Sequence, residues 1–309
     1  MNPPDEAQPK GLIADLSYRG YEGPLLTRRF RWWVITRNEI KLVFRNVWLL
    51  GLLVIFAYLI PGVQLYLRSF IPPEIVGERS FASYFYTGYS GSLFWLFLVA
   101  LLIGAPSIAG DNRANALQLL LAKPITKLDY LIGKLAAVFL ILFGMSLIPA
   151  LALYLFCLGS FNDQGFSKEA LGILPRIIAA SLLPAAVHSS VAVGVSARSK
   201  SPMVATAVYG ALYIALSIVS QIASNMVVDR SGQEVAATVM HLSISGVLSG
   251  IGQHIYNAQP SFLGQPLRIW GEPLPKPELL PMVALAAALC ALGITLAASH
   301  IQAVEVVRD

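Results

Sequence analysis

The residues able to carry out proton or metal chemistry are few in this 309-residue chain, which has four histidines and two cysteines. His188 stands alone in an apolar run, where a proton relay would need a second ionisable group at the same depth. His241 and His254 fall on different faces of a helix, so we expect no metal site there. Cys157 and Cys290 form no CxxC or Cys/His pattern, which argues against a zinc site or a disulfide framework.

Short motifs of common enzyme classes are missing from the sequence. It contains no GxxxxGK[ST] loop to cradle phosphates, no HExxH zinc motif and no GxSxG nucleophile turn. We therefore predict a non-catalytic chain, with no catalytic, cofactor-binding or metal-binding residues of its own.

Composition excludes a water-soluble globule. Only 13% of residues are charged, against about 25% in soluble domains, while 56% are hydrophobic and the mean hydropathy is +0.66. The net charge of +5 is too small to indicate nucleic-acid binding. The chain is instead divided into long apolar runs, which are typical of membrane-spanning helices.

Six of these runs are long enough to cross a bilayer. They cover residues 47–67, 90–109, 133–158, 174–196, 203–223 and 279–301. The predicted fold is an all-α polytopic membrane protein, with a polar tail over 1–24 and a six-span membrane domain over 47–309. The tail has no apolar core behind a basic flank, so we expect it to be retained rather than cleaved as a signal peptide.

The basic residues predict an orientation for these spans. Fifteen of the 22 Lys and Arg residues fall on one side of the arrangement and seven on the other. Because Lys and Arg are enriched in cytoplasmic loops, we expect both termini in the cytosol, in a bacterial-type inner membrane.

One segment leaves the number of spans open. Residues 235–256 are apolar enough for a seventh span, and the distribution of basic residues does not decide between six and seven. Its His, Gln, Ser and Gly residues weaken transfer into hydrocarbon. We interpret it as a short helix that lies on, or dips into, the outer leaflet, ahead of the last span.

A basic, Trp-rich amphipathic helix is predicted over 25–46, directly before the first span. Such a helix lies in the headgroup region, with its rings at the interface and its cationic groups in water. Packing like a helix of a soluble protein is the alternative. The residues expected to make the interfacial contacts are Phe30, Trp33, Arg37, Ile40 and Phe44.

Small residues repeat every four positions in two spans, which permits close helix approach. In the fourth span they are Ala186, Ser190 and Gly194. In the fifth span they are Ala207, Ala211 and Ala215.

The most informative segment is the predicted cytosolic loop over 109–134. Asp111 ends the second span and precedes a short apolar helix, which Pro124 terminates. Thr126 then caps a second helix, with Asp129 at its N3 position as an acidic capping-box partner, and this helix continues into the third span. The result is a projecting helical hairpin, which suits docking into a groove of a partner protein.

This hairpin resembles the corresponding motif in the membrane subunits of ABC-2 type transporters. That family has an acidic residue, a charged stretch, Gly-Thr, Leu-x-Leu-Leu-Leu, Pro-Ile-Ser or Pro-Ile-Thr, and Gly-Lys opening the third span. The chain departs at Asn115-Ala116, in place of Gly-Thr, and at Asp111, in place of the usual Glu. The matching residues are Asp111, Arg113, Leu117, Leu119, Leu120, Leu121, Ala122, Pro124, Ile125, Thr126, Gly133 and Lys134.

The resemblance implies the permease subunit of an ATP-driven exporter. Two copies, or one copy with a related permease, would associate with two ABC ATP-binding subunits made as separate chains, which would hold ATP and Mg²⁺. ATP-driven closure would reach the spans through the hairpin and the interfacial helix. The residues expected to couple to the ATP-binding subunit are Asp111, Arg113, Leu117, Leu120, Leu121, Lys123, Pro124 and Thr126.

The resemblance also implies where a substrate would pass. The first, second and fifth spans usually line the dimer interface in this family, so an amphipathic substrate would leave along it. The expected dimer or pathway residues are Ala207, Ala211, Ala215, Ser217 and Gln221. A mechanical or regulatory role of the ABC complex in envelope assembly is the alternative function. A secondary carrier is a third class, but it would need inverted repeats or midplane ion ligands, which we do not find in the sequence.

Overall fold

The computed structural model describes residues 30–70, 80–114 and 125–231 and, with gaps, 235–300. Two compact units are distinguished, Met1–Phe30 and Arg31–Asp309. The predicted polar tail over 1–24 lies outside the described residues, and every helix treated below belongs to the second unit.

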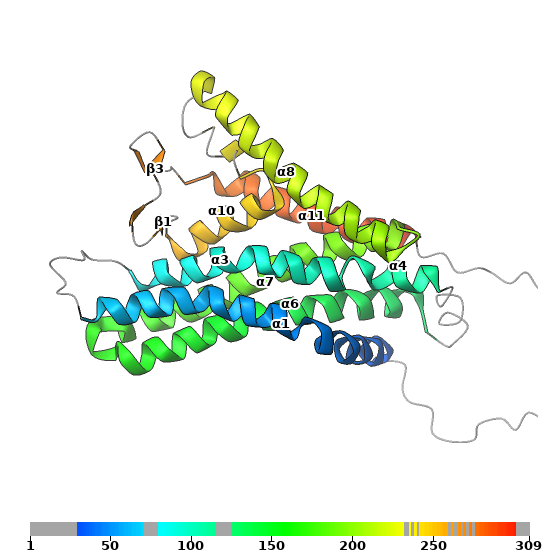
Figure 1. The fold of residues 1–309 in the computed structure, drawn as a ribbon, viewed down its shortest axis with the longest axis horizontal. Coiled ribbons are helices and arrows are strands. Elements are labelled where there is room, and N and C mark those ends of the chain that lie inside the picture. The colour runs from blue at the N-terminus through cyan, green and yellow to red at the C-terminus, as the bar shows by residue number, and fades with distance from the viewer. Residues whose placement is uncertain are drawn as a thin grey trace, which may run out of the picture. The chain divides into compact units, whose positions relative to one another are not determined.

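The second unit is built from long helices (Figure 1). Six of the described helical segments are long and apolar enough to cross a membrane, and each overlaps one of the six predicted spans. The all-α polytopic fold predicted from the sequence is therefore confirmed. The helices are α1 (Arg31–Arg68), α3 (Phe81–Ile103), α4 (Pro106–Arg113), α6 (Lys127–Ser160), α7 (Ser167–Arg198), α8 (Pro202–Ser231), α10 (Ile244–Tyr256) and α11 (Leu279–His300).

The remaining described elements are short. A π-helical turn, η2 (Asn162–Phe166), joins α6 to α7, and Gly165 there has φ 93°, a conformation that favours glycine. Two antiparallel pairs of two-residue strands follow α10, in register Ser261↔Pro266 and Arg268↔Pro273. These strands are β1 (Ser261–Phe262), β2 (Gln265–Pro266), β3 (Arg268–Ile269) and β4 (Glu272–Pro273).

The predicted interfacial helix and the first span form one helix in the structure. α1 runs from Arg31 to Arg68 as a single helix, and Figure 1 shows its dark blue N-terminal part turned away from the axis of the remainder. We call residues 31–46 of α1 the interfacial segment. The predicted start of this helix, residues 25–29, lies outside the described residues.

The length of helix α10 bears on whether residues 235–256 form a seventh span. It has 13 residues, which corresponds to about 20 Å of helix, whereas the hydrocarbon core is about 30 Å thick. It packs on α3, α7, α8 and α11 and is not among the six candidate spans. The short helix predicted within 235–256 is thus confirmed, and its position in the outer leaflet stays a prediction.

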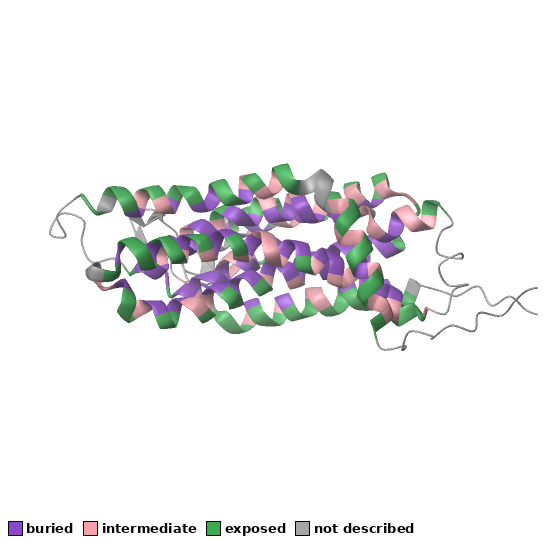
Figure 2. Ribbon diagram, turned by 90° about the horizontal axis from the view of Figure 1, so that it is seen from below, coloured by how far each residue is buried: buried purple, intermediate pink, exposed green. Residues whose placement is uncertain are grey.

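Glycine permits the closest helix contacts in the core. Helix α7 packs along α11, and a Cβ added to Gly194 would clash with the backbone of Gly293. A Cβ on Gly293 would in turn meet the carbonyl of Ser190, so the small-residue stripe predicted in the fourth span is a helix–helix contact. Figure 2 shows buried residues gathered along the inside of the helices and exposed ones along their outer faces.

Candidate coupling site

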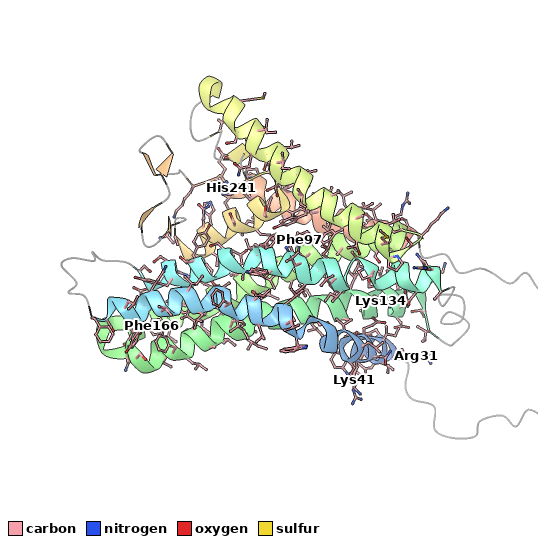
Figure 3. The ribbon with its side chains drawn as sticks, in the orientation of Figure 1. Arg31, Lys41, Phe97, Lys134, Phe166 and His241 are labelled. Atoms are coloured by element: carbon pink, nitrogen blue, oxygen red, sulfur yellow. The ribbon has the colours of Figure 1, made fainter. Side chains whose placement is uncertain are left out.

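A buried lysine joins three helices at one end of the bundle (Figure 3). Lys134, in the second turn of α6, is only 3% exposed. Its ammonium lies 2.7 Å from Glu39 Oε1 of α1 and 2.8 Å from Asp111 Oδ2 of α4, and it donates a hydrogen bond of 3.1 Å to the carbonyl of Ser107. A lysine has three N–H donors, so these partners satisfy the buried charge completely.

Contacts in the first turns of α6 hold Lys134 in position. Thr126 caps the helix, accepting a hydrogen bond from the N–H of Asp129, whose carboxylate accepts one from the N–H of Thr126. This is the capping box predicted from the sequence. Tyr130, one turn before Lys134, donates a 2.6 Å hydrogen bond to the same Asp111 oxygen that pairs with Lys134. Residues at i and i+4 share a helix face, so both side chains reach α4 together.

The interfacial segment is bound to α6 through its own polar residue. Thr36 Oγ1 lies 3.0 Å from both the carbonyl of Trp32 and the carbonyl of Gly133. A Cβ on Gly133 would lie 2.8 Å from Ile35 Cβ, so only glycine allows α1 and α6 to approach this closely. Thr36 and Glu39 are three residues apart and therefore present their polar groups to α6 from one face of α1.

Helix α4 is also anchored on α7. Ser196 Oγ accepts hydrogen bonds from the N–H groups of Ile108 and Ala109, at 2.9 and 3.0 Å. These N–H groups belong to the first turn of α4, where the helix itself supplies no acceptors. Asn112 Nδ2 lies 3.4 Å from the carbonyls of Ala197 and Ser199, so α4 is held along its length.

Comparison with known proteins identifies the family to which this chain belongs. Residues 33–245 match the family model described as "ABC-2 family transporter protein". The chain belongs to the ABC-2 transporter family. It is thus a multi-pass membrane protein, and its family works with an ABC ATP-binding partner.

Two curated relatives carry the same description, "Probable ABC transporter permease protein NosY". The protein from Pseudomonas aeruginosa is 29% identical over 177 residues, which cover 54% of this chain and 60% of the relative. The protein from Stutzerimonas stutzeri is 34% identical over 150 residues, which cover 46% of this chain and 45% of the relative. The chain therefore spans about half the length of the curated relatives it matches.

The structure of this ABC-2 permease describes two of the predicted coupling residues next to α6. Asp111 accepts a hydrogen bond from Tyr130 of α6, and Thr126 caps the first turn of the same helix. Arg113 is exposed at the end of α4. The other predicted coupling residues, Leu117, Leu120, Leu121, Lys123 and Pro124, lie outside the described residues.

The predicted interfacial residues divide between two faces. Phe30 and Trp33 are 65% and 44% exposed, and Arg37 is also exposed. Ile40 is half-buried and packs against the core. The side chain of Phe44 lies outside the described residues.

The polar partners at the centre of the site were not predicted as functional residues. Glu39, Tyr130 and Lys134 form it, and Thr36 supports it. The usable signal was the Gly-Lys pair of the family motif: a lysine at the start of an apolar run needs an acidic partner within reach. The sequence offered Asp111 as one partner but contained no pattern that singled out Glu39.

The alanine stripe of α8 is not covered by any of the residues that the structure describes. Ala207, Ala211 and Ala215 are all exposed, as is Gln221. Ser217 is half-buried, donates to the carbonyl of Tyr213 and lies 3.2 Å from the hydroxyl of Ser245 on α10. Ser217 and Gln221 also line a recess of about 340 Å³ on α8.

His188 is a hydrogen-bonded residue of the core. It is fully buried, and its Nδ1 lies 2.7 Å from the hydroxyl of Tyr209 on α8. Phe97, Tyr209 and Tyr213 surround its ring. These contacts join α3, α7 and α8.

Proposed function

We propose that this chain is the membrane-spanning permease subunit of an ATP-driven exporter. Two ABC ATP-binding subunits, made as separate chains and holding ATP and Mg²⁺, would drive it, and a second copy or a related permease would complete the complex. We place it in a bacterial inner membrane with both termini in the cytosol, where the basic residues are concentrated.

The proposal rests chiefly on the pairing of Lys134 with Glu39 and Asp111. Removing one partner of a buried ion pair costs about 3–5 kcal/mol, so these three charges resist separation. Lys134 therefore links the interfacial segment, the end of α4 and the start of α6. A displacement imposed on the hairpin predicted between α4 and α6 would reach α1 and α6 directly, which is what a coupling element requires.

The exposed face of α8 supports the remaining part of the proposal. A small-residue stripe permits close approach of a second helix, and none of the helices in the described part of the chain covers it. The neighbouring recess is apolar apart from Ser217, Gln221 and the Tyr213 hydroxyl. A second permease would pack on this face, and an amphipathic substrate would leave the cytosol beside it.

Co-purification tests the coupling site. The chain is expressed with its ABC ATP-binding subunit. The double variant Leu117→Asp/Leu120→Asp in the predicted hairpin is compared with a control, Leu171→Asp, which changes an exposed leucine near the start of α7. The hairpin variant should insert correctly yet lose the ATP-binding subunit and its ATP hydrolysis, whereas the control should keep both. If a correctly inserted hairpin variant still binds the ATP-binding subunit and supports its ATP hydrolysis, the assignment of the coupling site is wrong.

Transport itself needs a second measurement. Inside-out vesicles containing the intact complex should accumulate an amphipathic fluorescent dye when ATP is supplied, and vesicles with the hairpin variant should not. ATP hydrolysis by the intact complex without movement of any tested compound would favour the mechanical or regulatory role over export.

A further inference from the structure

A continuous apolar groove runs between α1 and α6. Two recesses of about 350 and 390 Å³ adjoin there and share Ile55 and Pro149 in their walls. The groove begins at Ile40 on the interfacial segment and continues to Phe156 on α6. We call it the α1/α6 groove.

The groove exists because small residues line it. The lining includes Gly51 and Gly62 of α1 with Gly144 and Ala152 of α6, and a Cβ added to Gly144 would meet no atom within 4 Å. The walls of the groove are nearly all hydrocarbon. Several of the residues that form them are exposed on the outside of the bundle: Leu52 is 49% exposed and Ile148 is 65% exposed. Since the groove lies along two membrane-spanning helices, its medium is lipid, and a flexible hydrocarbon chain fits its shape and chemistry.

The end of the groove at Ile40 is positively charged. Arg37 and Lys41, one turn apart beside Ile40, are both exposed, and neither pairs with an acidic side chain among the described residues. Figure 3 shows Lys41 projecting away from the bundle. The nearby carboxylate of Glu39 is held by Lys134 and does not neutralise them. An anionic group is therefore favoured at this end.

We propose that the α1/α6 groove binds an anionic phospholipid. One acyl chain lies along the groove from Trp48 towards Phe156, and the phosphate group contacts Arg37 and Lys41. The lipid would join the interfacial segment to the third span, on a side of α1 away from the contacts of Lys134 with Glu39 and Asp111.

Charge argues against a second copy of the chain as the occupant. In a two-fold symmetric dimer the same surface meets itself, so Arg37 and Lys41 of one copy would approach those of the other. Such like-charge contacts are unfavourable near a membrane surface, whereas a phosphate at the same place neutralises them.

Native mass spectrometry of the purified full-length chain tests this site. The protein is titrated with dioleoyl phosphatidylglycerol and, separately, with dioleoyl phosphatidylcholine, which has the same chains and a zwitterionic headgroup. Phosphatidylglycerol should bind more tightly. Arg37→Gln and Lys41→Gln should each weaken its binding about fivefold and leave phosphatidylcholine unchanged, because each cation contributes about a fivefold preference for anionic lipid.

Filling the groove should affect both lipids. Gly144→Leu should weaken binding of each by at least about fourfold, the contribution of one buried methylene. Gly159→Leu lies on the same helix beyond the groove, has equal space around its Cβ and should change neither. Lys200→Gln, which removes an exposed cation elsewhere, should also have no effect.

Two results would overturn the proposal. Equal binding of both lipids to wild type and to all five variants would show that the groove holds no specific lipid. A disulfide between two copies carrying Leu52→Cys, absent from the parent chain, would show that a second copy covers the groove instead.

Discussion

Glu39 and Lys134 are 95 residues apart in the sequence, and their charged groups are 2.7 Å apart in the structure. Lys134 is nearly inaccessible, while the carboxylates of Glu39 and Asp111 belong to side chains about one-fifth exposed. The ammonium of Lys134 is therefore enclosed by its two acidic partners, whereas each acid retains some access to solvent. This difference in solvent exposure determines how much unfolding free energy we expect each substitution to cost.

Replacing Lys134 should destabilise the bundle and uncouple it. Lys134→Met keeps the length of the side chain but leaves Glu39 and Asp111 facing each other without a cation. We expect a loss of about 3 kcal/mol in the free energy of unfolding, at the lower end for a broken buried pair because the acids are partly exposed. Thermal unfolding in detergent measures it. Lys168→Met, an exposed lysine at the start of α7, should stay within about 0.5 kcal/mol of wild type.

A double-mutant cycle should detect the contact between Glu39 and Lys134. Glu39→Gln and Lys134→Met each remove the ion pair, so the double variant should be less destabilised than the two single effects added together. We expect an interaction free energy of about 1–3 kcal/mol, as for residues in one ion-pair network. Additive single effects would mean that the two groups do not interact. The same cycle between Glu39 and Lys168 should be additive, since these residues make no contact.

The cap of α6 should contribute independently of the charges. Thr126→Ala removes the acceptor for the N–H of Asp129 and should cost about 1 kcal/mol of unfolding free energy. Thr126→Ser keeps the hydroxyl and should restore most of the stability. Because the cap positions Tyr130 and Lys134, ATP hydrolysis by the complex should fall in Thr126→Ala and recover in Thr126→Ser. Equal stability and activity of the two variants would contradict a capping role.

The sequence predicted features that depend on neighbouring residues. The spans followed from runs of apolar residues, and the capping box from Thr126 and Asp129 at the required spacing. The fourth-span stripe was recognised from its four-residue period, although the helix that it contacts was not. Each of these features is encoded within about 30 residues, so periodicity and spacing were sufficient.

The centre of the candidate site depends on contacts between distant segments. Glu39 lies in a predicted amphipathic helix, where a single acid is ordinarily a solvated residue, and its pairing with Lys134 requires α1 and α6 to be adjacent. Asp111 was expected to act toward a partner subunit, whereas in the structure its carboxylate pairs with Tyr130 and Lys134 of the same chain. Helix adjacency of this kind is set by packing of whole faces, which a single sequence does not specify.

Gly133 provides the sharpest test of the contact between α1 and α6. Gly133→Ala would place a methyl group 2.8 Å from Ile35 Cβ and 3.0 Å from the carbonyl of Trp32, so the interfacial segment must move. The expected cost is about 1–3 kcal/mol, as for overpacking in a core. Gly144→Ala, on the same helix but facing open space, should instead be neutral or stabilising by up to about 1 kcal/mol. Thermal unfolding of both variants compares them directly, and equal stabilities would show that the interfacial segment does not depend on close approach at Gly133.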